Sequence, residues 1–413
     1  MSEVKSPAVS GRERSAPRAA ILGSGPVGLD AALAAVERGF RVRVYEAGET
    51  PAANVRSWEH VRLFSPWRMN VSPRMERALE EVGAELDVDP EDSPTGREFA
   101  DHVLDPLWGA GPAAGTLHLS SRVVAVGREG VLKHEAIGSP ERGRLPFRIL
   151  LSDPAGREWI EHADVVFDCT GKYGNPNPMG ESGIPAPGER RLLDKIVRRI
   201  PDLPREADAW SGRTTLLVGA GHSAQTAARD LAKLASAGDG TRVVWAVRDE
   251  EPDWGRVADD PLPLRRELAE SSGRIEAGAF LGVELRRGVG VDRLEGSGGD
   301  VTVRLLSSTG DTEEIRVDRI LALTGGVGDH SLYRQLQIHE CYATSGPMKL
   351  SAALLGGGAG GDCLDQGTHG VETLTNPEPG FFILGDKSYG RNNTFLMRTG
   401  WGQVNEVFAS LAS

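Results

Sequence analysis

The sequence predicts an α/β fold built from two nested β-α-β domains. The prediction rests on a strand–turn–helix–strand pattern that occurs twice, with the two copies separated by nearly half of the chain. In the first copy, the apolar run Ala19–Leu22 enters a glycine-rich turn. Residues 29–38 then have the Ala and Leu content of a helix, and residues 41–46 alternate like a strand. These residues predict one complete β-α-β unit.

The second copy begins with the run Thr214–Val218, continues through a helix expected over 224–235, and reaches a strand at 242–247. β-rich sequence follows each copy and ends in a Thr-Gly pair, Thr170-Gly171 after the first and 324–325 after the second. The chain has 413 residues, which is enough for two or three domains of about 150 residues. The repeat therefore predicts two domains of the same class.

The glycine-rich turn of the first copy has the spacing Gly-x-Gly-x-x-Gly, which is typical of a phosphate-binding turn. Gly23 permits the tight turn, Gly25 lets a pyrophosphate approach the backbone, and Gly28 lets the helix pack closely on the sheet. Pro26 suits the first helical turn, because its missing N–H would be unpaired there. Glu46 ends the next strand, where a carboxylate accepts the ribose hydroxyls of an adenosine. We predict a bound dinucleotide; the alternative is a structural glycine loop at the edge of a sheet.

The second glycine-rich turn has Gly219 and Gly221 at the first two positions and Ala224 at the third, which tolerates alanine. His222 and Ser223 start the helix that follows, where free N–H groups attract phosphate. We predict that these five residues contact a second dinucleotide, with His222 a neighbour of the pyrophosphate rather than a general base.

Arg248 follows the second strand of this copy, at the place where the first copy has Glu46. A carboxylate there would repel the 2′-phosphate of NADPH, whereas a guanidinium pairs with it in a fork geometry. The position favours NADPH over NADH as the second cofactor. Asp249 and Glu250 follow directly, and their negative charge leaves NADH as an alternative cofactor. For Arg248 itself, the alternative is a solvated surface arginine.

A third motif, Gly385-Asp386, follows a buried strand expected at 381–384. An Asp in that position hydrogen-bonds the ribityl chain of a flavin, although a Gly-Asp pair alone is also a common turn. The following turn, with Thr399 and Gly400, would aim backbone N–H groups at the pyrimidine end of the flavin and stabilise negative charge on the reduced ring. Val124, on a strand expected at 122–126, completes the predicted cofactor-binding set.

Composition excludes several classes of protein. The formal net charge of −12 argues against a nucleic-acid binder, which needs a basic face. The absence of an apolar run of about 18 residues argues against a membrane span. The polar N-terminus lacks the apolar core of a signal peptide, so we expect a flexible tail and a cytoplasmic protein.

The cysteines and histidines argue against two further kinds of site. Cys169, Cys341 and Cys363 are far apart, and no CxxC pair exists, so a local redox dithiol is absent. So few cysteines also fit a reducing cytoplasm. The nine histidines lack metal-ligand spacing, so we predict no metal site.

The order of these motifs resembles the two-dinucleotide-binding flavoprotein superfamily over almost the whole chain after residue 18. Residues 219–224 and 244–248 are most similar to flavin-containing and N-hydroxylating amine monooxygenases. The resemblance implies FAD in the first site and NADPH in the second. It also implies hydride transfer to flavin N5 and capture of O₂ as a C4a-(hydro)peroxyflavin. The chain departs from flavin-containing monooxygenases because residues 172–218 contain no Phe and no His, so their FxGxxxHxxx fingerprint is missing. The missing cysteine pair argues against the thioredoxin and glutathione reductase branches.

Because the cofactor carries the chemistry, we expect residues that position or shield it rather than a protein nucleophile. By analogy with the monooxygenases, Asn70 is expected to hold the oxygenated flavin or NADP⁺; an ordinary loop asparagine is the alternative. Trp67 is expected to shield the ring, or else to be a core aromatic. Arg398 is expected to bind an acidic substrate or a cofactor phosphate, or else to form a surface salt bridge.

These observations define the expected organisation. A flexible tail at 1–17 precedes an FAD-binding domain formed by 18–208 and 322–413, with a substrate-side segment at 329–376. An NADPH-binding domain is inserted at 209–321. We predict an NADPH-consuming monooxygenase that uses O₂ to oxygenate a small-molecule amine, sulfur or carbonyl compound. The alternative is an NAD(P)H-dependent FAD reductase or dehydrogenase that does not oxygenate. The sequence leaves the oligomeric state open, with a homodimer as one alternative.

Overall fold

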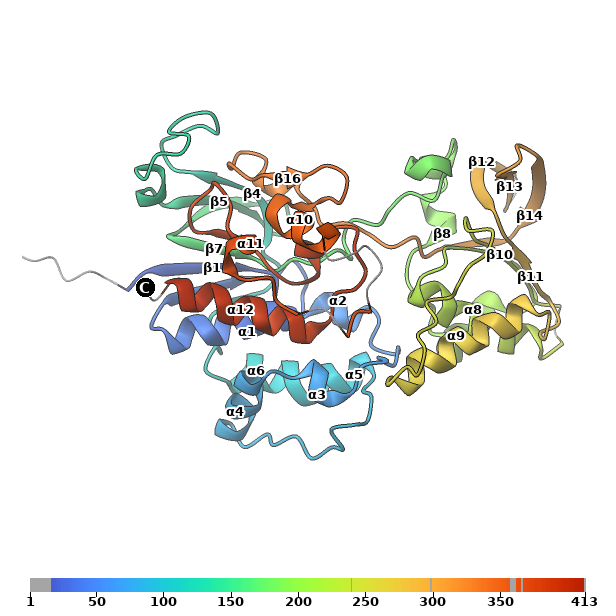
Figure 1. The fold of residues 1–413 in the computed structure, drawn as a ribbon, viewed down its shortest axis with the longest axis horizontal. Helices are drawn as coiled ribbons and strands as arrows, with labels where there is room; N and C mark the ends of the chain where they lie inside the picture. The colour runs from blue at the N-terminus through green and yellow to red at the C-terminus, as the bar shows by residue number, and fades with distance from the viewer. Residues whose placement is uncertain (1–15, 239, 298, 357–361, 365–366, 412–413) are drawn as a thin grey trace, which may run out of the picture.

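The computed structural model describes residues 16–238, 240–297, 299–356, 362–364 and 367–411. Two five-stranded parallel sheets dominate the fold and lie at opposite ends of the long axis of the molecule (Figure 1). The predicted α/β class with two nested Rossmann-type units is therefore confirmed. Most of the predicted flexible tail lies outside the described residues. No helix within the described ranges is long and apolar enough to cross a membrane.

The first sheet has the order β18-β7-β1-β2-β3, and every neighbouring pair is parallel. Its strands are β18 (Phe381–Ile383), β7 (Val165–Asp168), β1 (Arg18–Leu22), β2 (Arg41–Tyr45) and β3 (Leu117–His118). Because β18 pairs with β7, the C-terminal segment belongs to the same sheet as the N-terminal segment. We call this sheet and the layers that cover it the first unit.

Two layers cover the first sheet. Helices α1 (Pro26–Glu37) and α12 (Met397–Leu411) pack on one face, where Phe408 stacks on Phe167 with ring centroids 4.7 Å apart. An antiparallel sheet packs on the other face and contains β4 (Arg122–Arg128), β5 (Phe147–Ser152) and β6 (Glu158–Ala163). The apolar strands of the parallel sheet are thus buried on both sides, as their sequence requires.

Short helices beside and below α1 complete the helical side of the first unit (Figure 1). They are α2 (Ala53–Arg56), α3 (Trp67–Asn70), α4 (Pro73–Glu81), α5 (Gly96–Phe99) and α6 (Asp105–Ala110). Ser72 caps α4 by accepting from the backbone N–H of Met75, and its hydroxyl donates to the buried Asp30 of α1 at 2.5 Å. Thr95 and Glu98 form a capping box at α5.

The second sheet has the order β11-β10-β9-β15-β8, again all parallel. Its strands are β11 (Val283–Arg286), β10 (Arg242–Ala246), β9 (Thr214–Val218), β15 (Arg319–Ala322) and β8 (Ile196–Val197). Helices α8 (His222–Ala235) and α9 (Pro263–Glu276) pack on one face. The antiparallel strands β12 (Val289–Ser297), β13 (Asp300–Ser307) and β14 (Thr312–Val317) pack on the other. We call this assembly, with α7 (Leu203–Trp210), the second unit.

Two connecting segments join the units and run antiparallel, side by side (Figure 1). Pro176 and Gly326 form a β-bridge between them. The Asn177 side-chain amide donates to the Thr324 carbonyl at 3.1 Å, and the Thr324 hydroxyl donates to the Asn177 carbonyl at 2.7 Å. The two crossings therefore form a single joint between the units.

After the second connection, the chain returns to the first unit through short elements. These are β16 (Glu340–Cys341), β17 (Gly346–Pro347), α10 (Met348–Gly356) and α11 (Val371–Leu374). They form part of the segment that we expect on the substrate side, and part of that segment lies outside the described residues.

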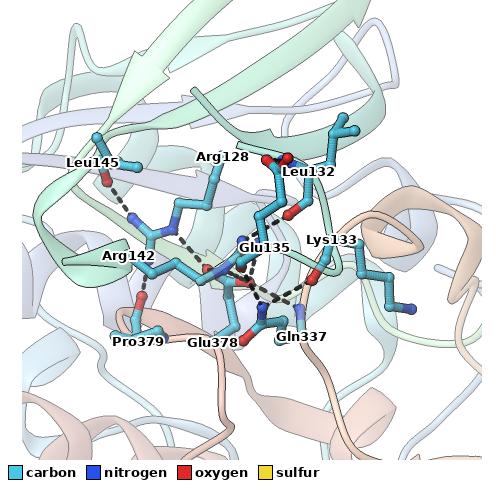
Figure 2. A network of polar contacts seen from close by, with 9 residues as sticks. All are labelled: Arg128, Leu132, Lys133, Glu135, Arg142, Leu145, Gln337, Glu378 and Pro379. Carbon is cyan, nitrogen blue, oxygen red and sulfur yellow. Dashed lines mark hydrogen bonds and ion pairs between the residues drawn. The ribbon is translucent and has the colours of Figure 1, made fainter. Parts of the chain in front are cut away.

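A buried ionic network fastens the connection between β4 and β5 to the C-terminal half of the first unit (Figure 2). The Glu378 carboxylate accepts from Arg128 Nε at 2.7 Å, from Arg142 Nε at 3.0 Å and from the Gln337 backbone N–H at 2.9 Å. The side chains of Glu378, Arg128 and Arg142 are at most 1 % exposed. Figure 2 shows that the two arginines also donate to backbone carbonyls, so the network fixes loops as well as side chains.

The structure differs from the expected element boundaries at three places. Helix α12 begins at Met397, so Thr399 and Gly400 lie in its first turn and not in a turn before it. Residues 172–212, which the expected bounds assign mostly to the FAD-binding domain, contain β8 and α7, because β8 pairs with β15, more than a hundred residues away. The second sheet therefore uses residues that precede the expected domain boundary at 209.

Candidate functional site

Four segments that are distant in sequence meet around the start of α1. The carbonyl of Cys169, just before the Thr-Gly pair, lies 2.8 Å from where a Cβ of Gly23 would be. Val27, in the first turn of α1, lies 3.2 Å from an equivalent Cβ of Gly385 and 2.7 Å from one of Gly400. The motifs at 23–28, 170–171, 385–386 and 399–400 thus form one site at the carboxyl end of the first sheet, where open α/β sheets bind ligands.

The glycine turn at this site fits a pyrophosphate. A Cβ on Gly28 would lie 2.0 Å from the Gly23 carbonyl, so the helix packs as closely as this motif requires. A Cβ on Gly25 would meet no atom within 4 Å, so that face of the turn is open. Helix α1 starts with Pro26 and has no side-chain cap among the described residues, which leaves its first N–H groups for an anion.

Glu46 is held next to the glycine turn by Ser24, which sequence reasoning missed. The Glu46 carboxylate accepts from the Ser24 N–H at 3.0 Å, from the Ser24 hydroxyl at 2.6 Å and from the Gly48 N–H at 2.9 Å. A carboxylate has about four acceptor positions, so these three donors leave room for a ribose hydroxyl. The signal in the sequence was a small hydroxyl residue between the first two glycines.

Val124 lies at a β-bulge near the same site. The pairing of β4 with β5 shifts register between Val123 and Ala125, which leaves Val124 as the extra residue. Its side chain is exposed, and bulged residues have main-chain groups outside the ladder. A residue at such a bulge can present its main-chain groups to a base edge.

A cleft of about 580 Å³ opens beside the Glu46 loop. Thr50, Pro51 and Trp108 are among its lining residues, together with Leu117 and Leu119 at the edge strand of the first sheet. Trp108 also donates its indole N–H to the Ser24 carbonyl at 3.0 Å. The cleft is therefore continuous with the residues that support the glycine turn.

Two crossed ion pairs join the Thr-Gly turn to the Gly-Asp turn. The Lys387 ammonium lies 2.6 Å from Asp168 Oδ2, and both side chains are fully buried. The Lys172 ammonium lies 2.8 Å from Asp386 Oδ1 and donates to the Asn392 carbonyl at 3.1 Å. Each pair links a residue beside one turn to a residue beside the other. Sequence reasoning identified Asp386 but missed the other three charged residues, because no local pattern marks their pairing.

Thr170 is part of the same arrangement. Its hydroxyl donates to Asp168 Oδ1 at 2.7 Å and accepts from Lys387 at 3.1 Å, while Gly171 follows with a φ of +69°. The positive φ suits glycine, which adopts it without steric cost. The predicted Thr170-Gly171 turn is thus held by hydrogen bonds to the buried Lys387–Asp168 pair.

The second unit repeats the glycine turn. A Cβ on Gly219 would lie 2.3 Å from the Leu323 carbonyl, just before the second Thr-Gly pair, and a Cβ on Gly221 would meet no atom within 4 Å. Ala224 is fully buried against the sheet, and Ser223 is exposed in the first turn of α8. Helix α8 also lacks a side-chain cap among the described residues. The second turn is therefore as open to an anion as the first.

Arg248 is exposed at the end of β10 and forms no side-chain hydrogen bond or ion pair with the described residues. Its acidic neighbours have partners of their own. Asp249 Oδ1 accepts from the Glu251 N–H at 3.1 Å, and Glu250 accepts from the hydroxyl of Ser308. The guanidinium is thus available to a ligand, while both neighbouring carboxylates are engaged locally.

His222, the first residue of α8, contacts the first unit. Its ring packs edge-on against Phe64, with the ring centroids 5.0 Å apart. Burial lowers the pKa of His222 from 6.5, and the nearby Arg265 lowers it further. The start of the second glycine-turn helix therefore lies against the loop that follows the first β-α-β unit.

The three residues proposed near the flavin have structural partners of their own. Asn70 is buried, and its amide donates to the Ser65 carbonyl at 2.8 Å and accepts from the Ser65 hydroxyl at 2.7 Å. Trp67 is also buried and packs beside Phe99, with ring centroids 6.3 Å apart. Arg398 donates to the Leu364 carbonyl. The structure places Asn70 and Trp67 on α3 and Arg398 at the start of α12.

Comparison with known proteins agrees with this geometry. Residues 21–82 match the family of NAD(P)-binding Rossmann-like domains. No curated protein sequence matches the chain. Three solved structures illustrate the likeness, and each covers 96 % of this chain and 98 % of its own. The bacillithiol disulfide reductase of Bacillus cereus has 19 % identity and a TM-score of 0.68. The ornithine hydroxylase of Pseudomonas aeruginosa has 15 % identity and a TM-score of 0.64. The thioredoxin reductase of Lactococcus lactis has 14 % identity and a TM-score of 0.60.

The chain therefore has the fold of the two-dinucleotide-binding flavoproteins, with one Rossmann-type unit inserted into another. Within this fold it is similar both to disulfide reductases and to N-hydroxylating monooxygenases.

Proposed function

We propose that the chain is an FAD-dependent oxidoreductase that takes hydride from NADPH and uses it to oxygenate a small molecule. The observation that carries the proposal is the pair of open glycine turns, one at the carboxyl end of each parallel sheet. The contact between Phe64 and His222 supports it, because it brings the surroundings of one turn onto the helix start of the other.

The residues around the first turn suit FAD. Gly25 and the start of α1 would receive the pyrophosphate, Glu46 the adenosine ribose, and the bulged Val124 the adenine edge. Asp386 would meet the ribityl chain, held in place by Lys172 at 2.8 Å. When bound, FAD supplies two-electron redox chemistry, while the protein supplies placement and electrostatics.

The second turn suits NADPH. Gly221 and Ser223 would receive the pyrophosphate at the open start of α8. Arg248 would pair with the 2′-phosphate, because its guanidinium is unengaged and the carboxylates of Asp249 and Glu250 are bound elsewhere.

Two of the three cysteines, Cys169 and Cys363, support an electron acceptor that diffuses into the site rather than a protein disulfide. Cys169 is half-buried, and desolvation, with a smaller contribution from Asp168, raises its pKa well above 9. Cys363 is buried, and burial raises its pKa to about 11. A thiolate is the reactive form of cysteine, so neither suits thiol–disulfide exchange. Oxygenation balances with O₂ as that acceptor: NADPH, a proton, O₂ and substrate yield NADP⁺, water and the oxygenated substrate.

A second candidate is an NAD(P)H-dependent reductase that does not oxygenate. The likeness to bacillithiol disulfide reductases favours it, since their TM-scores of 0.68 and 0.66 exceed the 0.59 to 0.64 of the hydroxylases. Cys341 is the cysteine whose pKa is lowered, through hydrogen bonds with Thr344. It would be the thiol involved in such a reaction.

Oxygen consumption distinguishes the two functions. The FAD-loaded protein is mixed with NADPH and a panel of amines, sulfides and ketones, and NADPH loss, O₂ uptake and H₂O₂ are measured together. A monooxygenase substrate should raise NADPH and O₂ consumption equally, lower the H₂O₂ yield and acquire one ¹⁸O atom from ¹⁸O₂. Disulfide reduction under argon that is lost in Cys341→Ser, with no ¹⁸O incorporation from the panel, would instead establish the reductase. Failure of NADPH to bleach the flavin would reject both.

A further inference from the structure

The two units meet at a second place, away from their connecting segments, and Arg265 lies at its centre. Arg265 lies in the first turn of α9, the helix that extends toward the first unit in Figure 1. Its Nε and Nη2 bind both oxygens of Asp260 in the second unit at 2.7 and 2.8 Å. Its Nη1 and Nη2 bind both oxygens of Asp362 in the first unit at 2.5 and 2.9 Å. One guanidinium thus forms a bidentate pair with a carboxylate of each unit, a geometry specific to arginine.

This contact is buried and is surrounded by apolar side chains. Arg265 is 4 % exposed, and the side chain of Asp362 is 15 % exposed. Leu262 of the second unit packs with Met69, Cys363 and Leu396 of the first. Water is largely excluded from the contact, so the ion pairs are weakly screened and directional.

The contact also reaches both proposed cofactor sites. Phe64, which packs with the same apolar cluster, contacts His222 at the start of α8. Arg398, in the first turn of α12, donates to the carbonyl of Leu364, the residue that follows Asp362 and Cys363. Movement of residues 362–364 relative to Arg265 would therefore release the second glycine turn from the first unit.

We propose that Arg265 and Asp362 form a latch that positions the second unit for hydride transfer. The connecting segments form one joint, and the ring of His60 also contacts the Ile200 carbonyl of the second unit at 3.1 Å. The latch fixes the units at a point beyond that joint and holds the start of α8 against the Phe64 loop. Arg265 and Asp362 touch neither glycine turn, so they are positioning residues. The kinetic consequence rests on the proposed function, whereas the mechanical role does not.

The rate at which a maleimide labels Cys363 measures whether the latch is closed. The Cys363 sulfur lies 3.0 Å from Arg265 Nη1 and the residue is only 9 % exposed, so it should react with a maleimide more slowly than Cys341. We expect Asp362→Asn and Arg265→Lys to accelerate labelling of Cys363 several-fold, with Cys169 unchanged as an internal control. The labelled positions are assigned by peptide mass spectrometry. Asp300→Asn, which removes the exposed pair with Arg316 in the same unit, should leave all rates unchanged.

Hydrogen exchange separates opening of the units from local loosening of residues 362–364. If the latch holds the units together, Asp362→Asn should accelerate exchange in residues 64–70 and at the start of α8, although neither segment adjoins the substitution in sequence. Faster exchange confined to residues near 362 would overturn the proposal. Arg265→Lys provides a second variant that keeps the charge if Asp362→Asn fails to fold.

Anaerobic rapid mixing tests the positioning role. At saturating NADPH, flavin reduction in Asp362→Asn should be slower by about ten- to a hundredfold, since displacements of about 1 Å have effects of that size. FAD affinity and reduction by dithionite should be unchanged. An unchanged rate of reduction by NADPH in a variant with accelerated Cys363 labelling would overturn the positioning role. If NADPH reduces neither protein, the proposed function fails, while labelling and exchange still decide whether the latch exists.

Discussion

Replacement of Glu378 by Ala should destabilise the first unit more than any substitution of an exposed ion pair. Glu378 is the shared acceptor for Arg128, Arg142 and the Gln337 backbone N–H (Figure 2). The three charged side chains are essentially inaccessible to solvent. Alanine would leave two buried guanidinium groups facing each other without a counter-charge.

The expected size follows from this burial. Removing one partner of a buried ion pair costs about 3–5 kcal/mol, because the remaining charge stays desolvated. For a domain of this size, 1 kcal/mol moves the unfolding midpoint by roughly 2–4 °C, so the expected decrease is roughly 6–20 °C. Glu378→Gln should have a smaller effect than Glu378→Ala, because the amide keeps one acceptor oxygen and fills the same space.

Thermal unfolding followed by circular dichroism at several scan rates would test this expectation. Asp300→Asn is the matched control, because its partner Arg316 is 69 % exposed and such pairs contribute about 0–1 kcal/mol. A midpoint for Glu378→Ala within about 2 °C of wild type would refute the reasoning. It would mean that water enters the network of Figure 2 and solvates the two guanidinium groups.

Three further predictions concern the proposed cofactor sites. Arg248→Ala should lower kcat/KM for NADPH by roughly 10- to 100-fold, the value of a charged hydrogen bond, and leave NADH unaffected; equal losses for both cofactors would contradict a 2′-phosphate contact. Gly25→Val should keep the wild-type unfolding midpoint but purify without flavin absorbance. Gly28→Val should lower the unfolding midpoint and also lose the flavin, because its Cβ would lie 2.0 Å from a backbone carbonyl. Stoichiometric flavin in Gly25→Val would contradict the proposed site. Since burial lowers the folded-state pKa of His222, its contact with Phe64 should be complete above about pH 6.5 and weaken as pH falls below it. Hydrogen exchange of residues 64–70 should therefore be faster at the lower of two pH values in the wild type. In His222→Gln this difference should be absent, although Asp260 and Arg265 still face the same position.

Local sequence patterns predicted the parts of the fold that depend on local interactions. Both glycine turns occur where expected, because their spacing reflects the geometry of one strand, one turn and one helix. The start of α12 was misplaced by a few residues because Thr399 and Gly400 are poor helix formers in isolation. They are helical here because Gly400 packs closely against Val27 and Phe395.

The α/β class, the internal repeat and the motif residues could be predicted from local patterns, since each depends on neighbours within about 30 residues of chain. Tertiary structure alone decided which charges meet. Lys387 and Asp168 are 219 residues apart, and Arg265 and Asp362 are 97 apart. No periodicity connects such residues, because folding pairs them to satisfy charges that burial has removed from water. Sequence therefore identified the two glycine turns, and only the folded chain showed the ion pairs that support the first turn and hold the two units together.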